Sequence, residues 1–237
     1  MEKKKITAIV LAAGKGNRMN TPVAKQFLIL RDKPVLYYSL KAFEDSSVDE
    51  IILVTGSDQK EYCINNIIQP YQLNKVTQIV EGGKERYDSV YQALLHIEET
   101  DYVLIHDGAR PFITKEFIEE MISQVIDHNA CIFGTPVKET VKTVDSNRYI
   151  TSTPNRNTMW LAQTPQAFSF EAIKKAYTIF YKENNKNQVA ITDDAMVYET
   201  YLGKPVKMIP GDYRNIKITT PEDLTIAEAF LNKELSE

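Results

Sequence analysis

Cysteine and histidine are scarce in this chain of 237 residues, which contains two cysteines and three histidines. Cys63 and Cys131 lie far apart inside amphipathic or apolar segments, and the histidines form no metal-ligand spacing with them. Small secreted domains and zinc modules instead show paired or closely spaced cysteines. The sequence therefore argues against a disulfide framework and against a thiol-bound zinc site.

Long hydrophobic runs and a strong positive charge are also missing. No stretch reaches about 18 uninterrupted apolar residues, and MEKKKITAIV leads into a strand-like run without a signal core. We therefore expect a cytoplasmic protein with no membrane partner. The 28 basic and 32 acidic residues give a net charge of −4, so we expect no nucleic-acid partner. Any anionic ligand must be bound by a local group of cations.

Strand-like and helix-like patterns alternate along the chain. Short β-branched runs lie at residues 6–12, 51–55, 76–80, 102–106 and 130–135, and a strand-like segment follows at 205–210. Helical periodicity occurs at residues 35–43, 59–68, 88–97, 115–128, 170–183 and 193–201. This alternation predicts an α/β fold.

The predicted strands are nearly continuous apolar runs, such as AIVLAA, IILV and YVLI. Such strands suit a parallel sheet that is covered on both faces, and ligands of these sheets gather at the carboxyl ends of the strands. No internal repeat, low-complexity tract or Gly/Ser linker divides the chain, so we predict one domain over residues 1–237. Thr220 is the predicted N-cap of a last helix, with Pro221 at its first position.

One segment, from Pro136 to Asn155, does not fit this alternation. It contains two polar, β-branched stretches joined by a predicted turn at residues 145–148, with too few apolar residues for the core sheet. A ribbon of two strands is only marginally stable alone. The segment therefore packs against a second copy of the protein or folds back on its own domain.

The loop after the first strand carries three cations, Lys15, Arg18 and Lys25, beside Gly14 and Gly16. Glycine leaves backbone N–H groups free to approach a ligand, and cations near such a loop favour phosphate. Together they predict a site for a polyphosphate chain.

Two familiar phosphate-binding patterns fail in this loop. A P-loop requires G-x-x-x-x-G-K-[ST], but KGNRMN follows Gly14, and the dinucleotide pattern G-x-G-x-x-G fails at Met19. The acidic residue that would bind a ribose hydroxyl is also missing, because Thr55 and Gly56 stand at the end of the second strand. Both observations disfavour a dehydrogenase.

Eight motifs follow one another over the whole chain: LAAGKGNRM, KQF, GGKERYDSV, HDGARPF, ETVK, AQTPQAF, ITDDA and NIKITTPEDL. In this order they closely resemble the methylerythritol phosphate cytidylyltransferases. The resemblance implies a Rossmann-like α/β nucleotidyltransferase with a mostly parallel twisted sheet and helices on both faces. It also implies CTP and a polyol phosphate as substrates, a divalent metal, normally Mg²⁺, and a homodimer through a projecting β-arm at about residues 136–160.

The resemblance divides the candidate site residues into three groups. The implied catalytic residues are Arg18, Lys25 and Lys217. The implied nucleotide-binding residues are Ala12, Ala13, Gly14, Lys15, Gly16, Gly83, Arg86, Ser89, Asp107 and Gly108, with Asp107 also the metal ligand. The implied acceptor-binding residues are Arg110, Thr140, Arg156, Thr164, Thr192 and Asp193. An acceptor phosphate is already ionised at neutral pH, so cations and metal, rather than a covalent catalyst, should dominate the site.

At some positions the residues also allow a purely structural interpretation. Asp88 or Ser89 would serve as an ordinary helix cap, and Thr192 or Asp193 would cap the helix that follows them. Three sites depart from the family pattern: Ala24 stands where proline commonly precedes the lysine, Gly108 replaces the usual alanine, and TPNR replaces a sequence that more often carries aspartate before its arginine.

Two alternative functions are weighed against this interpretation. The ribitol phosphate cytidylyltransferases tend to have LAGG in the first loop, whereas this chain has LAAG and also follows the methylerythritol pattern at ETVK, Trp160 and ITDDA. A nucleotide-binding module without catalysis would be expected to lose some of the cations. Lys25, Asp107 and Lys217 are all present, which argues against such a module.

Overall fold

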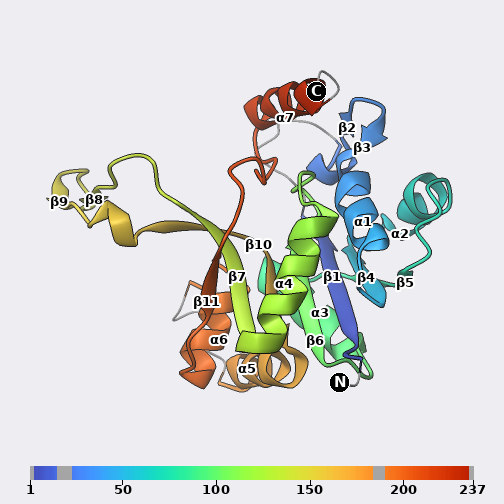
Figure 1. Ribbon diagram of the computed structural model, residues 1–237, viewed down its shortest axis with the longest axis horizontal. Coiled ribbons are helices and arrows are strands. Elements are labelled where there is room, and N and C mark those ends of the chain that lie inside the picture. Colours follow the sequence, from blue (N-terminus) through green and yellow to red (C-terminus); the bar gives the residue numbers. More distant parts are fainter. Residues whose placement is uncertain (1–2, 15–22, 184–189, 235–237) are drawn as a thin grey trace.

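A sheet of seven strands forms the centre of the computed structural model, which describes residues 3–14, 23–183 and 190–234 (Figure 1). The strand order is β11-β7-β10-β6-β1-β4-β5. The strands are β1 (Ile6–Ala12), β4 (Glu50–Thr55), β5 (Val76–Glu81), β6 (Tyr102–Asp107), β7 (Ala130–Pro136), β10 (Trp160–Ser169) and β11 (Lys207–Pro210). Among these strands β10 alone is antiparallel to its neighbours, and the other pairs run parallel.

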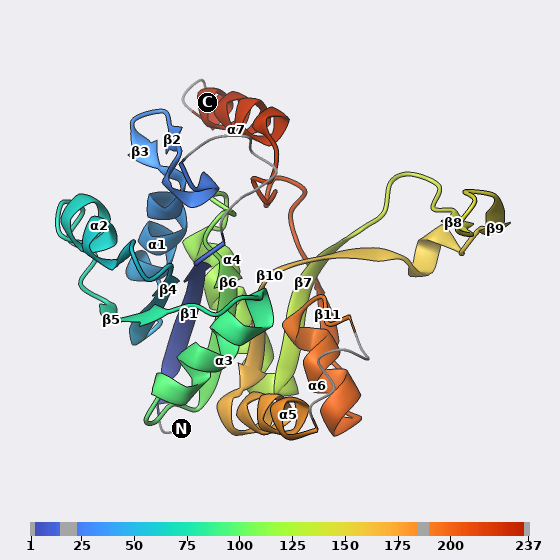
Figure 2. The same ribbon diagram turned by 180° about the vertical axis from the view of Figure 1, so that it is seen from behind.

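Helices cover both faces of this sheet (Figures 1 and 2). They are α1 (Val35–Asp45), α2 (Lys60–Cys63), α3 (Arg86–His96), α4 (Lys115–His128), α5 (Phe170–Lys182), α6 (Asp194–Leu202) and α7 (Pro221–Glu234). Ala8 and Val10 of β1 pack with α1 and α4, whereas Ile9 packs with α3, α5 and α6. Because successive strand residues point to opposite faces, the apolar run of β1 is buried on both sides. The predicted α/β sheet with two covered faces is confirmed.

Most predicted elements occur within one or two residues of their expected ends. The helix expected at residues 59–68 is a single turn, α2, that continues as a π-helical turn, η3 (Ile64–Ile68). The helix expected from Asp88 already begins at Arg86. Its N-cap is Glu85, and the carboxylate of Asp88 accepts a hydrogen bond from the Glu85 N–H at 3.1 Å. Asp88 therefore completes a capping box with Glu85 from the first turn, whereas Ser89 lies inside that turn and is not the cap.

The sequence did not predict β10, whose residues WLAQTPQAFS include two glutamines and a proline. Such a composition is poor in the β-branched residues that favour strands. Its polar side chains are nevertheless buried because they have partners. The Gln166 side-chain oxygen accepts the N–H groups of Asp194 and Ala195, at 3.1 and 3.0 Å. This strand therefore brings polar groups into the middle of the sheet.

Residues 136–160 form an arm that projects from the body of the protein (Figures 1 and 2). Its tip contains two short antiparallel strands, β8 (Thr143–Val144) and β9 (Ile150–Ser152). The predicted turn between them is present, since the Asp145 carboxylate accepts the N–H groups of Asn147 and Tyr149 at 2.9 Å. The alternative in which this segment folds back on its own domain is wrong.

The last helix, α7, lies over a small hairpin of β2 (Ile29–Leu30) and β3 (Lys33–Pro34), which follows the 3₁₀ turn η2 (Lys25–Phe27). Asp223 accepts the N–H groups of Thr219 and Thr220 at 2.8 and 2.9 Å, which satisfies donors at the helix start. Within the described ranges no helix is both long and apolar enough to cross a membrane.

Both thiols offer a test of this packing. Cys63 and Cys131 are free and fully buried, and burial raises the pKa of each thiol to about 12. Since the thiolate is the reactive species, we expect neither cysteine to react with a disulfide reagent such as DTNB in the folded protein. Both should react once the protein is unfolded in guanidinium. Rapid labelling of one thiol under native conditions would contradict the placement of α2 or β7.

Candidate active site

A cleft of about 640 Å³ lies at the carboxyl ends of β1, β5 and β6. This is the edge where parallel sheets generally bind ligands. Residues from six separate stretches of chain line it: Leu11 to Gly14, Lys25 and Gln26, Gly83 to Arg86, Ser89, Asp107 and Ala109, and Lys217 and Thr219. The cleft brings together these predicted site residues: Ala12, Ala13, Gly14, Lys25, Gly83, Arg86, Ser89, Asp107 and Lys217.

The glycine-rich rim of the cleft is held by specific contacts. The Gln26 side-chain amide donates to the carbonyl of Ala12 at 2.5 Å and to that of Gly14 at 3.1 Å. A Cβ atom on Gly82 would lie 2.8 Å from the Ser89 hydroxyl, so only glycine lets the turn after β5 approach this closely. The same Cβ would overlap with the Ala13 Cβ, so the two glycine turns pack directly against each other, and both line the cleft.

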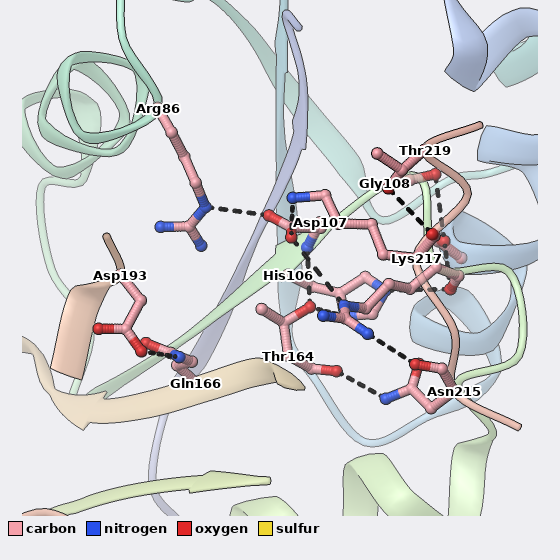
Figure 3. Close-up of polar contacts among 12 residues, drawn as sticks. Arg86, His106, Asp107, Gly108, Thr164, Gln166, Asp193, Asn215, Lys217 and Thr219 are labelled. Atoms are coloured by element: carbon pink, nitrogen blue, oxygen red, sulfur yellow. Dashed lines mark hydrogen bonds and ion pairs between the residues drawn. The ribbon is translucent and has the colours of Figure 1, made fainter. Parts of the chain in front are cut away.

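Asp107 lies at the centre of the site, at the end of β6, and three cations surround its carboxylate (Figure 3). Arg86 Nε is 3.0 Å from one carboxylate oxygen and Lys217 Nζ is 2.7 Å from the other, with Arg110 Nε at 4.0 Å. Burial alone would raise the pKa of Asp107, but the three cations hold it well below its ordinary value. Asp107 is therefore ionised at neutral pH.

Arg86 joins this carboxylate to a second one. Its Nη2 donates to Asp194 at 2.8 Å, and the fully buried Asp194 also accepts the Tyr177 hydroxyl at 2.6 Å. Burial opposes the charge on Arg86, yet Asp194 and Asp107 raise its pKa well above the ordinary value. The Arg86 side chain is 26% exposed, but a charged guanidinium held between two carboxylates has little freedom to turn. Arg86 thus has a defined orientation at the wall of the cleft.

Below the carboxylate lies a layer of hydrogen-bonded polar groups. The Asp107 N–H donates to the Thr164 hydroxyl at 3.1 Å, and the same hydroxyl is 3.1 Å from His106 Nδ1. The Asn215 side chain donates to the Thr164 carbonyl at 2.9 Å, and Arg110 Nη1 donates to the Asn215 carbonyl at 2.6 Å. Burial lowers the pKa of His106 to about 3, so its imidazole is neutral. This layer connects β6, β10 and the segment that carries Lys217.

Other predicted residues lie at different distances from the cleft. Gly108 is packed beneath it, where its N–H donates to the Leu11 carbonyl at 2.9 Å and an added Cβ would lie 2.7 Å from a Leu36 methyl group. Asp193 is the N-cap of α6 and accepts a hydrogen bond from Gln166 at 2.9 Å. The neighbouring Thr192 is exposed.

The arm carries two of the predicted acceptor residues away from the cleft of their own chain (Figure 2). Thr140 is exposed on the outgoing leg, and Arg156 lies in the 3₁₀ turn η4 (Arg156–Thr158), where it donates to the Lys138 carbonyl at 3.1 Å. Three predicted residues, Lys15, Gly16 and Arg18, lie outside the described residues.

Several residues of the site were missed by sequence reasoning. The motifs contain them, since Asp194 is the second aspartate of ITDDA and Asn215 begins NIKIT, but their partners are 108 and 51 residues away in the chain. Gln26 was likewise only part of KQF. Nothing in the local pattern indicates which distant group a buried amide or carboxylate will meet, so the second carboxylate of Arg86 became evident only in three dimensions.

The buried ion pair of Arg86 gives a stability prediction. Replacing Asp194→Asn removes the fully buried carboxylate of this pair and leaves the partly exposed guanidinium with Asp107 alone. Loss of one partner of a buried pair typically costs about 3–5 kcal/mol, and the exposure of Arg86 places the expected loss at the lower end. We expect the free energy of unfolding in urea to fall by about 3 kcal/mol. The control is Asp45→Asn, which removes an exposed pair with Lys41 and should change stability by less than about 0.5 kcal/mol. Equal effects of the two substitutions would show that the buried pair is not stabilising.

Comparisons with known proteins point to one family. The match to 2-C-methyl-D-erythritol 4-phosphate cytidylyltransferase (IspD) spans residues 6–233. A protein of that name from Lachnoclostridium phytofermentans is 50% identical over 230 residues, 97% of each chain. Another from Lachnospira eligens is 50% identical over 226 residues, 95% of this chain and 98% of the relative.

A solved structure agrees with these sequence matches. The crystal structure of 4-diphosphocytidyl-2C-methyl-D-erythritol synthase from Anaerococcus prevotii has a TM-score of 0.83 and 33% identity, covering 97% of this chain and 96% of that one. The resemblance carried by the eight motifs and the Rossmann-like fold that it implies are both confirmed. The chain belongs to the 2-C-methyl-D-erythritol 4-phosphate cytidylyltransferase family of nucleotidyltransferases.

Proposed function

We propose that this chain transfers the cytidylyl group of CTP to 2-C-methyl-D-erythritol 4-phosphate and releases pyrophosphate. Family membership supports this reaction, and the observation that carries it is the cluster of cations around Asp107 in a cleft at the carboxyl edge of the sheet. Two anionic substrates must meet there, so the site has to neutralise their mutual repulsion.

The reaction needs no covalent intermediate on the protein. An oxygen of the acceptor phosphate attacks the α-phosphorus of CTP, a new P–O bond forms, and the bond to the bridging oxygen of the β-phosphate breaks. The electron pair of that bond leaves with pyrophosphate. Lys25 and Lys217 line the cleft and would stabilise the charge on the phosphoryl oxygens and the leaving group. Arg18 is proposed for the same task from the loop outside the described residues.

The base of CTP would lie against the two glycine turns. Gly83 N–H donates to the Ser89 hydroxyl at 3.1 Å, and Ala13 lines the cleft beside them. This narrow site would suit the single ring of a pyrimidine better than a purine. Arg86, oriented by its two carboxylates, would lie beside the nucleotide.

Mg²⁺ is the proposed cofactor, with Asp107 as its protein ligand. The described residues contain no cluster of three or more His, Cys, Asp or Glu side chains suited to a metal ion. Mg²⁺ commonly takes only one or two protein carboxylates and completes its shell with substrate phosphates and water, so a single ionised Asp107 in the cleft fits it. When bound, the metal would neutralise charge on the triphosphate. Asp107 would have to exchange part of its contact with Lys217 for the ion.

A homodimer through the arm is proposed from the exposed side chains at the end of the arm. Three large apolar side chains are exposed there: Tyr149 is 73%, Ile150 63% and Val144 53% accessible. A second copy that covered them would gain from their burial. The same contact would bring Thr140 and Arg156 of one subunit to the acceptor site of the other.

The cytoplasm is the proposed compartment, and the free thiols at Cys63 and Cys131 are in keeping with its reducing conditions.

The first experiment measures pyrophosphate release with Mg²⁺ and compares two donors and two acceptors. We expect turnover with CTP and methylerythritol phosphate, and little with UTP or with ribitol phosphate. Preference for ribitol phosphate would keep the cytidine site but would support the alternative acceptor. No release with any pair, in a protein that still binds CTP by calorimetry, would support a nucleotide-binding module without catalysis.

The role of Lys217 is tested by Lys217→Ala. Loss of one group that stabilises a phosphoryl oxygen should lower turnover by roughly 10²–10³. The control is Lys204→Ala, an exposed lysine before β11, which should leave turnover within about twofold. Circular dichroism and thermal melting check that both variants fold. A Lys217→Ala enzyme as active as the control would remove Lys217 from the proposed mechanism.

Mixed dimers test whether the site is shared. After verified subunit exchange between Lys25→Ala and Arg156→Ala proteins, half of the dimers are mixed, and each mixed dimer has one site with neither lesion. We therefore expect about one quarter of wild-type turnover, far above either parent. Activity no greater than the average of the two parents would mean that each subunit completes its own site.

A further inference from the structure

His106 is fully buried directly below Asp107, and both of its ring nitrogens have polar neighbours (Figure 3). Nδ1 is 3.1 Å from the Thr164 hydroxyl oxygen, and Nε2 is 3.3 Å from the Arg110 carbonyl oxygen. The edge-to-face contact with Phe43, at 5.3 Å between ring centres, packs the imidazole from α1. The function described so far assigns this side chain no task.

The neighbours determine where the imidazole proton lies. The Arg110 carbonyl can only accept a hydrogen bond, so Nε2 must carry the proton and donate it. Neither ring nitrogen hydrogen-bonds to a carboxylate in the described part of the chain, and the fully buried ring lies between a carbonyl and a hydroxyl, which favours the neutral imidazole. Nδ1 is therefore an acceptor. Placing the proton on Nδ1 would leave two lone pairs facing each other at Nε2.

This assignment determines the direction of the Thr164 hydroxyl. Its hydrogen points to His106 Nδ1, and one of its lone pairs already accepts the Asp107 N–H at 3.1 Å. A hydroxyl has one hydrogen and two lone pairs, so a single lone pair remains. Thr164 has no hydrogen left to donate to a substrate.

We propose that His106 is a positioning residue that makes Thr164 a pure hydrogen-bond acceptor, so that the acceptor substrate must present a hydroxyl hydrogen to it. This rests on the proposed function and on the acceptor-binding role that the family resemblance implies for Thr164. A polyol has such hydrogens, whereas an ether or carbonyl oxygen at the same place would meet only a lone pair. His106 and Thr164 therefore select an acceptor substrate that carries a hydroxyl group at this place.

The same imidazole also contacts the backbone of Arg110, another residue predicted to bind the acceptor substrate. The Arg110 carbonyl accepts from His106 Nε2 and also from the Ser39 hydroxyl at 3.0 Å. Arg110 Nη1 reaches the Asn215 carbonyl, while the buried Nε has no hydrogen-bond partner among the described residues. A buried donor without a partner is costly, and an anionic or hydroxyl oxygen of the acceptor would satisfy it. His106 thus orients the Thr164 hydroxyl as a hydrogen-bond acceptor, and it holds the backbone of Arg110, whose side chain is a hydrogen-bond donor.

The tautomer is tested by long-range ¹H–¹⁵N NMR on protein with labelled histidine. Only three histidines are present, so a single substitution of each assigns the signals. We expect His106 to be neutral and protonated at Nε2 at pH 7.5, with Nδ1 bare. A proton on Nδ1, or an imidazolium, would overturn the inference. This measurement needs no substrate and does not depend on turnover.

The functional consequence is tested with two substitutions. His106→Phe keeps the ring packing and removes both nitrogens, and we expect the acceptor KM to rise on the order of tenfold, as for one lost buried hydrogen bond. The Kd for CTP, measured by calorimetry without acceptor, should stay within about twofold. His106→Asn places an amide oxygen near the position of Nδ1 and should recover part of the acceptor KM. The exposed His96→Gln is the control.

A double-mutant cycle separates positioning from a merely structural role. If His106 acts mainly through Thr164, adding His106→Phe to a Thr164→Val enzyme should raise the acceptor KM by clearly less than the roughly tenfold rise it causes alone, because only its contact with the Arg110 carbonyl is then lost. Additive effects, an unchanged acceptor KM, or an equal loss of CTP affinity would overturn the inference. Absence of turnover in the unmodified protein would instead refute the proposed function. The NMR experiment does not depend on turnover, so the two failures can be told apart.

Discussion

The site depends on one carboxylate, that of Asp107, which serves as counter-ion for cations from three parts of the chain. Arg86 comes from α3, Arg110 from the turn after β6, and Lys217 from the segment before α7. Three positive groups so close together in a partly buried space would repel one another strongly without it. A protein with a net charge of −4 can therefore still present a positive cleft to an anionic ligand.

One reversal of the chain produces both the arm and the polar layer under this carboxylate. β7 leaves the sheet as the outgoing leg of the arm, and β10 returns from the arm and enters the sheet between β7 and β6. The returning strand must be antiparallel for that reason. It begins at the exposed Trp160 and continues to the buried Thr164 and Gln166. The base of the arm and the polar layer below Asp107 are thus parts of one continuous strand.

The two kinds of polar burial in the site have different physical bases. Arg86 keeps its charge because Asp107 and Asp194 lie on either side of it, whereas burial lowers the pKa of His106 more than the nearby Asp107 charge raises it, so His106 is neutral. The charged pair orients a side chain at the wall of the cleft. The hydrogen bond between His106 and Thr164 orients a hydroxyl in the layer below Asp107. Charge and hydrogen-bond direction are therefore controlled separately in adjacent layers.

The sequence by itself determined the layered α/β fold, because continuous apolar strands and periodic helices are local patterns, and it determined the candidate cations through motifs at strand ends. Only the tertiary structure decided that β10 is a strand, since its polar side chains become favourable only when partners such as Asp194 meet them. It also decided that Glu85 caps α3 and that Arg86 has two counter-ions. These features depend on pairs of residues far apart in the chain, whose meeting no local pattern records.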